Sequence, residues 1–144
     1  MTSRFPDVNV IINNAGVQGS HGFAADAPLD EQALLDEVNT NHLGVIRFSA
    51  AFLPHLKAKG GATLINVSSG LAFVPLARIP VYCATKAALH SFTVSLHHQL
   101  RGMGIKVVEL IPPYVATELD RTTRHAKSEG ARHQCRSTRS SPKR

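Results

Sequence analysis

Three short apolar runs divide the chain, and each ends where small or rigid residues begin. They cover residues 8–12, 63–67 and 105–111 and are rich in valine, isoleucine and leucine. The first run leads into a polar stretch at Asn13, and the third stops at Pro112, which has no amide hydrogen with which to continue a central strand. This pattern predicts three buried strands.

Two longer segments between these strands space their apolar residues as amphipathic helices do. The first begins after Asp30, a suitable N-cap, and ends near Gly60. The second runs from about Val81 to Met103. Strands that alternate with helices of this length predict an α/β fold, in which the helices pack on a parallel sheet as right-handed crossovers.

The interior of the first helix contains a local conflict. Asn39, Thr40 and Asn41 are three weak helix formers in a row, each of which costs a few tenths of a kcal/mol relative to alanine. Irregular turns such as π-bulges often lie at functional sites, because they redirect a carbonyl or a side chain. An exposed polar stretch that packing tolerates is the alternative interpretation, and both stay open at this point.

Length and charge divide the chain into a domain and a tail. The 144 residues allow one domain at most. Residues 1–120 carry eight basic and nine acidic side chains, a net charge of −1, whereas residues 121–144 carry eight basic and one acidic, a net charge of +7. Because the second segment has no apolar periodicity, we expect a folded domain over 1–120 and a disordered basic tail over 121–144.

Ser69, Tyr82 and Lys86 form a candidate acid/base group. Ser69 follows the second strand, Tyr82 and Lys86 begin the next helix, and ligands collect at the carboxyl ends of parallel strands. The four-residue spacing puts Tyr82 and Lys86 on one helical face, so we expect the ammonium to lower the pKa of the phenol from about 10. Ser69 is then expected to hydrogen-bond a substrate carbonyl or alcohol oxygen, whose proton Tyr82 exchanges. Taken alone, this spacing also fits an ordinary helix surface.

Further motifs surround these residues in a fixed order. They are Asn13-Asn14-Ala15-Gly16, the helix-interior Asn41, Ile65-Asn66-Val67-Ser68-Ser69, Tyr82-Cys83-Ala84-Thr85-Lys86, and the stretch from Ile111 to Glu118. In these motifs the chain resembles the short-chain dehydrogenase/reductase family over about residues 5–120. The resemblance implies a partial Rossmann-like, doubly wound parallel sheet of about three strands plus two long helices.

The resemblance also implies roles for individual residues. The catalytic positions are Asn41, Ser69, Tyr82 and Lys86, with Asn41 holding a water in a proton relay that leads to Lys86. The cofactor-binding positions are Asn14, Ala15, Gly16, Tyr82, Lys86, Val115 and Thr117. The first three would lie beside the adenosine-side ribose, Tyr82 and Lys86 at the nicotinamide ribose, and the last two beside the nicotinamide.

The family's Gly-rich turn, which cradles the pyrophosphate of the cofactor, has no counterpart in the twelve residues before Asn13. The chain therefore resembles a member truncated in its N-terminal half and altered after Glu118, with residues 8–12 as an exposed apolar edge. Two functions follow. One is a hydride-transferring oxidoreductase that uses NAD or NADP, with a slight preference for NADP, on a small carbonyl or secondary alcohol. The other is a catalytically inactive fragment that acts as an interaction or dimerisation partner.

Partners and compartment follow from the remaining composition. Cys83 and Cys135 lack metal-ligand spacing and the N-terminus lacks a secretory apolar core, so we predict no metal site and a cytoplasmic protein. The basic tail could contact phosphates of a nucleic acid or a membrane surface. It has no interleaved aromatic residues, and we therefore expect neither partner. The two long helices offer a possible homo-oligomer interface.

Overall fold

A three-stranded parallel sheet forms the centre of the computed structural model, which describes residues 4–23, 28–113 and 119. Its strands lie in the order β1 (Val10–Asn13), β2 (Ala62–Val67) and β3 (Ile105–Leu110). In the middle strand, Ile65 pairs with Ile12 on one side and Val108 on the other. All three predicted strands are confirmed, and because they are parallel their carboxyl ends meet at one edge of the sheet.

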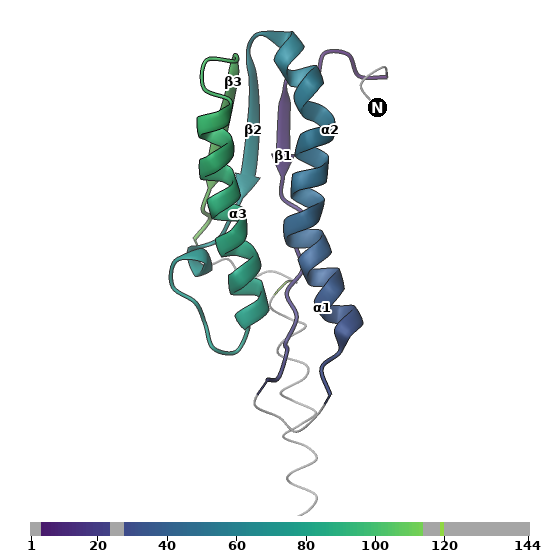
Figure 1. Cartoon of the computed structure of the whole chain (residues 1–144), viewed down its shortest axis with the longest axis vertical. Helices are drawn as coiled ribbons and strands as arrows, with labels where there is room; N and C mark the ends of the chain where they lie inside the picture. Colours follow the sequence, from purple (N-terminus) through teal and green to yellow (C-terminus); the bar gives the residue numbers. More distant parts are fainter. Residues whose placement is uncertain (1–3, 24–27, 114–118, 120–144) are drawn as a thin grey trace, which may run out of the picture.

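Two helical columns lie side by side over one face of this sheet (Figure 1). The first column consists of α1 (Glu31–Val38), the π-helix η1 (Asn39–Leu43) and α2 (Gly44–Lys59), and the second is α3 (Pro80–Gln99). A short 3-10 helix, η2 (Gly70–Ala72), follows β2. Asp30 caps α1 as predicted, because its Oδ1 accepts a hydrogen bond from the Ala33 amide at 3.0 Å.

The apolar core lies between the sheet and the two columns. Leu56 of α2 and Leu64 of β2 are fully buried there, and Leu96 of α3 is 5% exposed. Side chains of this size each contribute roughly 1.5–3 kcal/mol when they are fully removed from water. The core therefore fixes the columns on the sheet and, with them, the helix that carries Tyr82 and Lys86.

The aromatic and methionine side chains divide between this core and the surface. Phe52 is buried and Phe92 packs against the core. Phe48, Phe73 and Met103 lie outside it and are 41%, 51% and 48% exposed. Met103 lies beyond the end of α3, which stops at Gln99, before the predicted end of the helix. Phe48 stacks on the Phe52 ring, with the two ring centroids 4.5 Å apart, at the exposed flank of α2.

A buried polar network joins the strands to the helices. Asn13 Nδ2 donates to Ser49 Oγ of α2 at 3.1 Å and to Asn66 Oδ1 of β2 at 2.7 Å. Asn66 Nδ2 in turn donates to Thr93 Oγ1 of α3 at 2.9 Å, and the Thr93 hydroxyl donates to the Leu89 carbonyl. Because buried polar groups are costly unless they are paired, this network fixes where β1 and β2 end relative to both columns.

The turn between α2 and β2 depends on a left-handed glycine. Gly60 is the C-cap of α2 with φ +67°, and Gly104, before β3, packs against its backbone. We expect Gly60→Ala to lower the free energy of unfolding by about 1 kcal/mol, because a Cβ disfavours this conformation. Urea denaturation measures the change. Gly61→Ala, next to it, is the control: its φ is not left-handed and its Cβ would meet nothing within 4 Å. Equal effects of the two substitutions would contradict the prediction.

The second face of the sheet is apolar and has no helical cover among the described residues. Val10 and Ile12 of the edge strand β1 are 47% and 57% exposed, and Leu110 of β3 is 50% exposed. The predicted exposed apolar edge is thus confirmed. No helix in the described part of the chain has both the length and the apolar character that a membrane span requires.

Candidate active site

The end of β2 and the first turns of α3 bring Ser69, Tyr82 and Lys86 together. Helix α3 opens with Pro80, whose fixed φ suits a first helical turn. Tyr82 and Lys86 lie one turn apart and are only 6% and 4% exposed. Lys86 Nζ lies 5.7 Å from the centroid of the Tyr82 ring and donates to the Val67 carbonyl at 2.9 Å. The Ser69 side chain is close enough to the Tyr82 phenol to lower its pKa, so the three predicted groups share one place.

Ser69 is oriented by the helix that it begins. It is the N-cap of η2, and its Oγ accepts a hydrogen bond from the Leu71 amide at 3.2 Å. This bond uses a lone pair and leaves the hydroxyl hydrogen free to be donated. The serine therefore presents a donor at the carboxyl edge of the sheet.

The electrostatics of Tyr82 differ from the sequence-based expectation. Burial raises the pKa of its phenol above the ordinary value of 10.0, the Ser69 hydrogen bond opposes this rise, and Cys83 and Glu37 add to it. The predicted net lowering of this pKa is therefore wrong, because burial outweighs the effects that favour the phenolate. Lys86 is itself buried, burial lowers its own pKa, and its ammonium is held by the Val67 carbonyl.

The burial of Lys86 predicts a specific dependence of stability on pH. Its pKa in the folded chain lies below the ordinary value of 10.5, so between these two values the unfolded chain binds more protons. The contribution of Lys86 to the free energy of unfolding therefore rises as the pH rises through that interval. In urea denaturation from pH 8 to 10, Lys86→Met should lack this contribution, whereas the exposed control Lys57→Met should keep it. Parallel pH curves for all three proteins would contradict the assignment.

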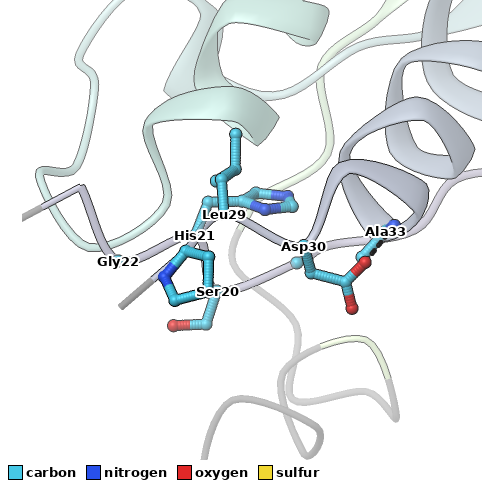
Figure 2. A pocket seen from close by; sticks show the side chains of 8 residues that line it. Ser20, His21, Gly22, Leu29, Asp30 and Ala33 are labelled. Atoms are coloured by element: carbon cyan, nitrogen blue, oxygen red, sulfur yellow. Dashed lines mark hydrogen bonds between the residues drawn. The ribbon is translucent and has the colours of Figure 1, made fainter. Parts of the chain in front are cut away.

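A cavity lies next to α1, bordered by the segment that follows β1 (Figure 2). Its volume is about 310 Å³, and His21, Leu29 and Asp30 are among the residues that line it. The Asp30 carboxylate is already used to cap α1. The cavity was not predicted from the sequence, because loop residues carry no periodicity that would place them.

The three weak helix formers Asn39-Thr40-Asn41 lie in the π-helix η1. An irregular turn was one of the two interpretations of this stretch. The Gly44 amide bonds to the Asn39 carbonyl five residues back, which widens the turn. Asn41 is fully buried inside it. The irregular turn therefore directs an amide side chain into the space between the two helical columns.

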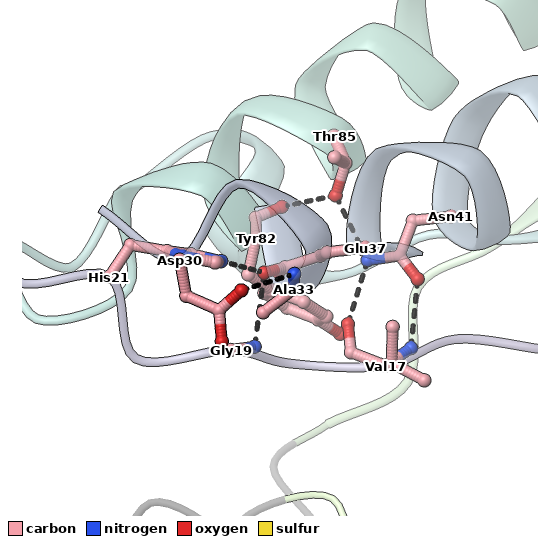
Figure 3. Close-up of polar contacts among 9 residues, drawn as sticks. All are labelled: Val17, Gly19, His21, Asp30, Ala33, Glu37, Asn41, Tyr82 and Thr85. Atoms are coloured by element: carbon pink, nitrogen blue, oxygen red, sulfur yellow. Dashed lines mark hydrogen bonds and ion pairs between the residues drawn. The ribbon is translucent and has the colours of Figure 1, made fainter. Parts of the chain in front are cut away.

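Asn41 connects three segments of the site (Figure 3). Its Nδ2 donates to the Val17 carbonyl at 2.8 Å and to Thr85 Oγ1 of α3 at 3.1 Å, and its Oδ1 accepts from the Val17 amide at 2.8 Å. Both amide hydrogens are thus in use. A Cβ on Gly16 would stand 3.5 Å from Asn41 Oδ1 and 3.6 Å from Lys86 Nζ, so this glycine lies against both.

The remaining predicted cofactor positions lie around this group or beyond the described residues. Asn14 and Ala15 follow β1 and are exposed at the carboxyl edge of the sheet. Val115 and Thr117 fall outside the described residues, as does the tail over 121–144. Leu119 packs against the cluster of Ile79, Tyr82 and Cys83, which brings the chain after β3 back to the catalytic helix.

Sequence reasoning missed a buried hydrogen bond between a histidine and a glutamate of the column that faces Tyr82. His21 Nε2 lies 2.7 Å from Glu37 Oε2, and the two side chains are 3% and 1% exposed. Glu37 stands one helical turn before Asn41 and so shares its face, a signal that the sequence did contain. His21 lies in an irregular segment, where no spacing rule could have identified it.

The fold and this site together identify the class of protein. The family described as short chain dehydrogenase matches residues 1–128, and the chain belongs to this family. The match covers the sheet, both helical columns and every residue of the group built around Tyr82.

Three relatives illustrate the membership. The chain is 45% identical to the oxidoreductase DltE of Bacillus subtilis (strain 168) over 83% of this chain and 47% of that protein. It is 30% identical to the NADP-dependent 3-hydroxy acid dehydrogenase of Schizosaccharomyces pombe over 91% and 50% of the two chains. The crystal structure of a gluconate 5-dehydrogenase from Burkholderia cenocepacia J2315, in complex with NADP and tartrate, is similar with a TM-score of 0.75 and 28% identity over 84% and 46%. The chain thus spans about half the length of these relatives.

Proposed function

We propose that the chain carries the proton-transfer site of an oxidoreductase that moves a hydride between a nicotinamide cofactor and a carbonyl or secondary alcohol. The observation that carries this proposal is the meeting of Ser69, Tyr82 and Lys86 at the carboxyl edge of β2. Asn41 supports it, because its amide is bonded to Thr85, the neighbour of Lys86 in α3.

Each residue has a role that its surroundings support. Ser69 donates a hydrogen bond to the substrate oxygen and holds that oxygen beside Tyr82. In the direction of reduction, Tyr82 gives its phenolic proton to this oxygen as the adjoining carbon accepts the hydride. The raised pKa of Tyr82 keeps the phenol protonated at neutral pH, as an acid must be. Lys86, 5.7 Å from the ring centroid, stabilises the phenolate left behind.

The residues present fit the nicotinamide-ribose side of a dinucleotide. An ammonium has three donors and the Val67 carbonyl takes one from Lys86, so others remain for a ribose. The missing side chain of Gly16 leaves space next to Lys86 and Asn41. We also assign Tyr82 to the nicotinamide ribose, Asn14 and Ala15 to the adenosine-side ribose, and Val115 and Thr117 to the nicotinamide. When bound, the cofactor supplies or takes up the hydride.

We propose NADP as the cofactor. One relative is named NADP-dependent, and the gluconate 5-dehydrogenase structure contains NADP. Their names also suggest the first substrates to test, a 3-oxo acid and a keto sugar acid. Both are small and polar, and the exposed carboxyl edge of the sheet gives such molecules access to Ser69.

The test is cofactor binding and turnover by the purified full chain. The fluorescence of NADPH and NADH reports binding without interference from tryptophan, which the chain lacks. Loss of absorbance at 340 nm with the substrate panel reports turnover. We expect saturable binding, tighter for NADPH, and substrate-dependent oxidation. Absence of binding to either cofactor would overturn the proposal.

A second candidate function is pairing with another polypeptide, without catalysis. The observation that favours it is the uncovered apolar face of the sheet, with Val10, Ile12 and Leu110 about half exposed. Light scattering of the same preparation distinguishes the two functions. A dimer that binds no cofactor supports the pairing function alone, whereas a monomer that binds NADPH rules out the pairing function.

A further inference from the structure

Glu37 is a buried carboxylate that the proposed proton transfer does not use. Its side chain is 1% exposed. Oε2 accepts hydrogen bonds from the Gly19 amide at 3.0 Å and pairs with His21 Nε2 at 2.7 Å. Oε1 is buried and has no hydrogen-bond partner. A buried carboxylate with one unsatisfied oxygen lowers the stability of the fold, so the presence of Glu37 at this position needs a physical reason.

The position of Glu37 relates it to the catalytic helix. It precedes Asn41 by one turn in the first column, just as Tyr82 precedes Lys86 by one turn in α3. Asn41 reaches Thr85 across the gap between the columns, and α1, which carries Glu37, packs against α3, which carries Tyr82. The two columns therefore face each other with an amide next to the lysine turn and a carboxylate next to the tyrosine turn.

The segment that follows β1 is fixed across both turns (Figure 3). Asn41 binds the amide and the carbonyl of Val17, and Glu37 binds the amide of Gly19 and the ring of His21. A Cβ at Gly19 would stand 2.6 Å from His21 Nε2 and 2.8 Å from Glu37 Oε2, so a side chain there would displace this pair. The segment is therefore held at three successive points close to the site.

We propose that Glu37, with His21, is a positioning residue of this site: it fixes residues 17–21 against the catalytic helix and places a negative charge beside Tyr82. The proposal rests on the proposed function for its consequence in catalysis, but its physical content does not depend on turnover. Glu37 acts through Tyr82 and through the loop, and it does not itself contact the reacting atoms.

The charge effect has a defined sign. Among the described residues, the groups that face Tyr82 are Glu37 from α1, Cys83 and Lys86 from α3, and the Ser69 hydroxyl after β2, while His21 faces Glu37. Glu37 raises the pKa of the Tyr82 phenol, because a nearby negative charge disfavours the phenolate. Neutralising Glu37 should therefore let Tyr82 ionise at lower pH.

Titration of the Tyr82 phenol tests this directly. The chain has two tyrosines and no tryptophan, so the phenolate absorbance near 295 nm, with and without Tyr82→Phe, isolates Tyr82. We expect Glu37→Gln, which keeps the size and an acceptor for Gly19, to shift the Tyr82 titration to lower pH. The exposed control Glu31→Gln, in the first turn of the same helix, should leave it in place. An unchanged titration in Glu37→Gln would overturn the charge role.

A second variant tests the loop and also decides the case if Glu37→Gln does not fold. Glu37→Asp keeps the charge but withdraws the carboxylate from Gly19. Hydrogen exchange of the Gly19 amide should then be at least several-fold faster than in the parent chain. Unchanged exchange in Glu37→Asp would overturn the positioning role. Both measurements are made without substrate, so a chain that shows both shifts but no turnover would refute the proposed function and leave this inference standing.

Discussion

Tyr82→Phe is expected to reduce the turnover of a carbonyl substrate by about 10²- to 10⁴-fold, which is the usual contribution of a positioned acid. The substitution removes only the phenolic hydroxyl, whose pKa the neighbouring Ser69 side chain affects. The ring is 6% exposed and packs with Ile79 and Cys83, and this packing does not need the hydroxyl. The loss should therefore fall on the chemical step, with cofactor affinity changed much less. Initial rates of NADPH oxidation and fluorescence titration of NADPH measure the two effects separately.

Ser91→Ala is the matched control for this experiment. Ser91 is an exposed hydroxyl residue on the same helix, two turns beyond the site. Removing its hydroxyl should change turnover by less than twofold, since it touches nothing in the site. Turnover by Tyr82→Phe within a few-fold of the parent chain would show that another group donates the proton.

Asn66→Ala is expected to lower the free energy of unfolding by about 2–4 kcal/mol, because it removes two hydrogen bonds of a buried network and leaves a cavity. Asn66 is fully buried and accepts from Asn13 while it donates to Thr93. Its loss leaves the Asn13 amide with Ser49 alone and loosens the ends of β1 and β2. Urea denaturation of the full chain, followed by circular dichroism, measures the change.

Asn9→Ala is the control for the loss of an amide at the surface. Asn9 precedes β1 and is exposed, so its replacement should change stability by less than about 0.5 kcal/mol. If Asn66→Ala were as stable as Asn9→Ala, the network would not contribute to folding, and the ends of β1 and β2 would be held by the apolar core alone.

The sequence was sufficient to predict those parts of the fold that depend on the spacing of apolar residues and on the proline, glycine and capping residues at the ends of elements. The alternation of apolar runs with helical stripes predicted β1, β2 and β3 within two residues at each end. The weak helix formers around Asn41 indicated either an irregular turn or a tolerated polar stretch, and the structure has a π-helix there. These signals are local, so they can be interpreted without knowledge of the tertiary contacts.

Properties that depend on burial could not be predicted in this way. The spacing of Tyr82 and Lys86 placed them correctly, but the direction of the Tyr82 pKa depends on how far the whole fold removes the phenol from water. The pairing of Glu37 with His21 joins a helix to an irregular loop 16 residues away. Phe48 belongs to the apolar stripe of its helix and yet lies at its margin, because the sheet is too narrow to cover it.

The π-helix has a consequence for how the first column tolerates changes in length. Its inward residues Glu37, Asn41, Val45 and Ser49 recur every four positions, a spacing that in a regular helix would drift about 40° per step around the axis. The wide turn takes up part of that drift, and all four side chains are buried. Because a π-turn holds one residue more than a regular turn, deleting one residue from 39–43 should leave α1 and Glu37 nearly in place, whereas the same deletion within α2 would rotate everything before it by roughly 100°.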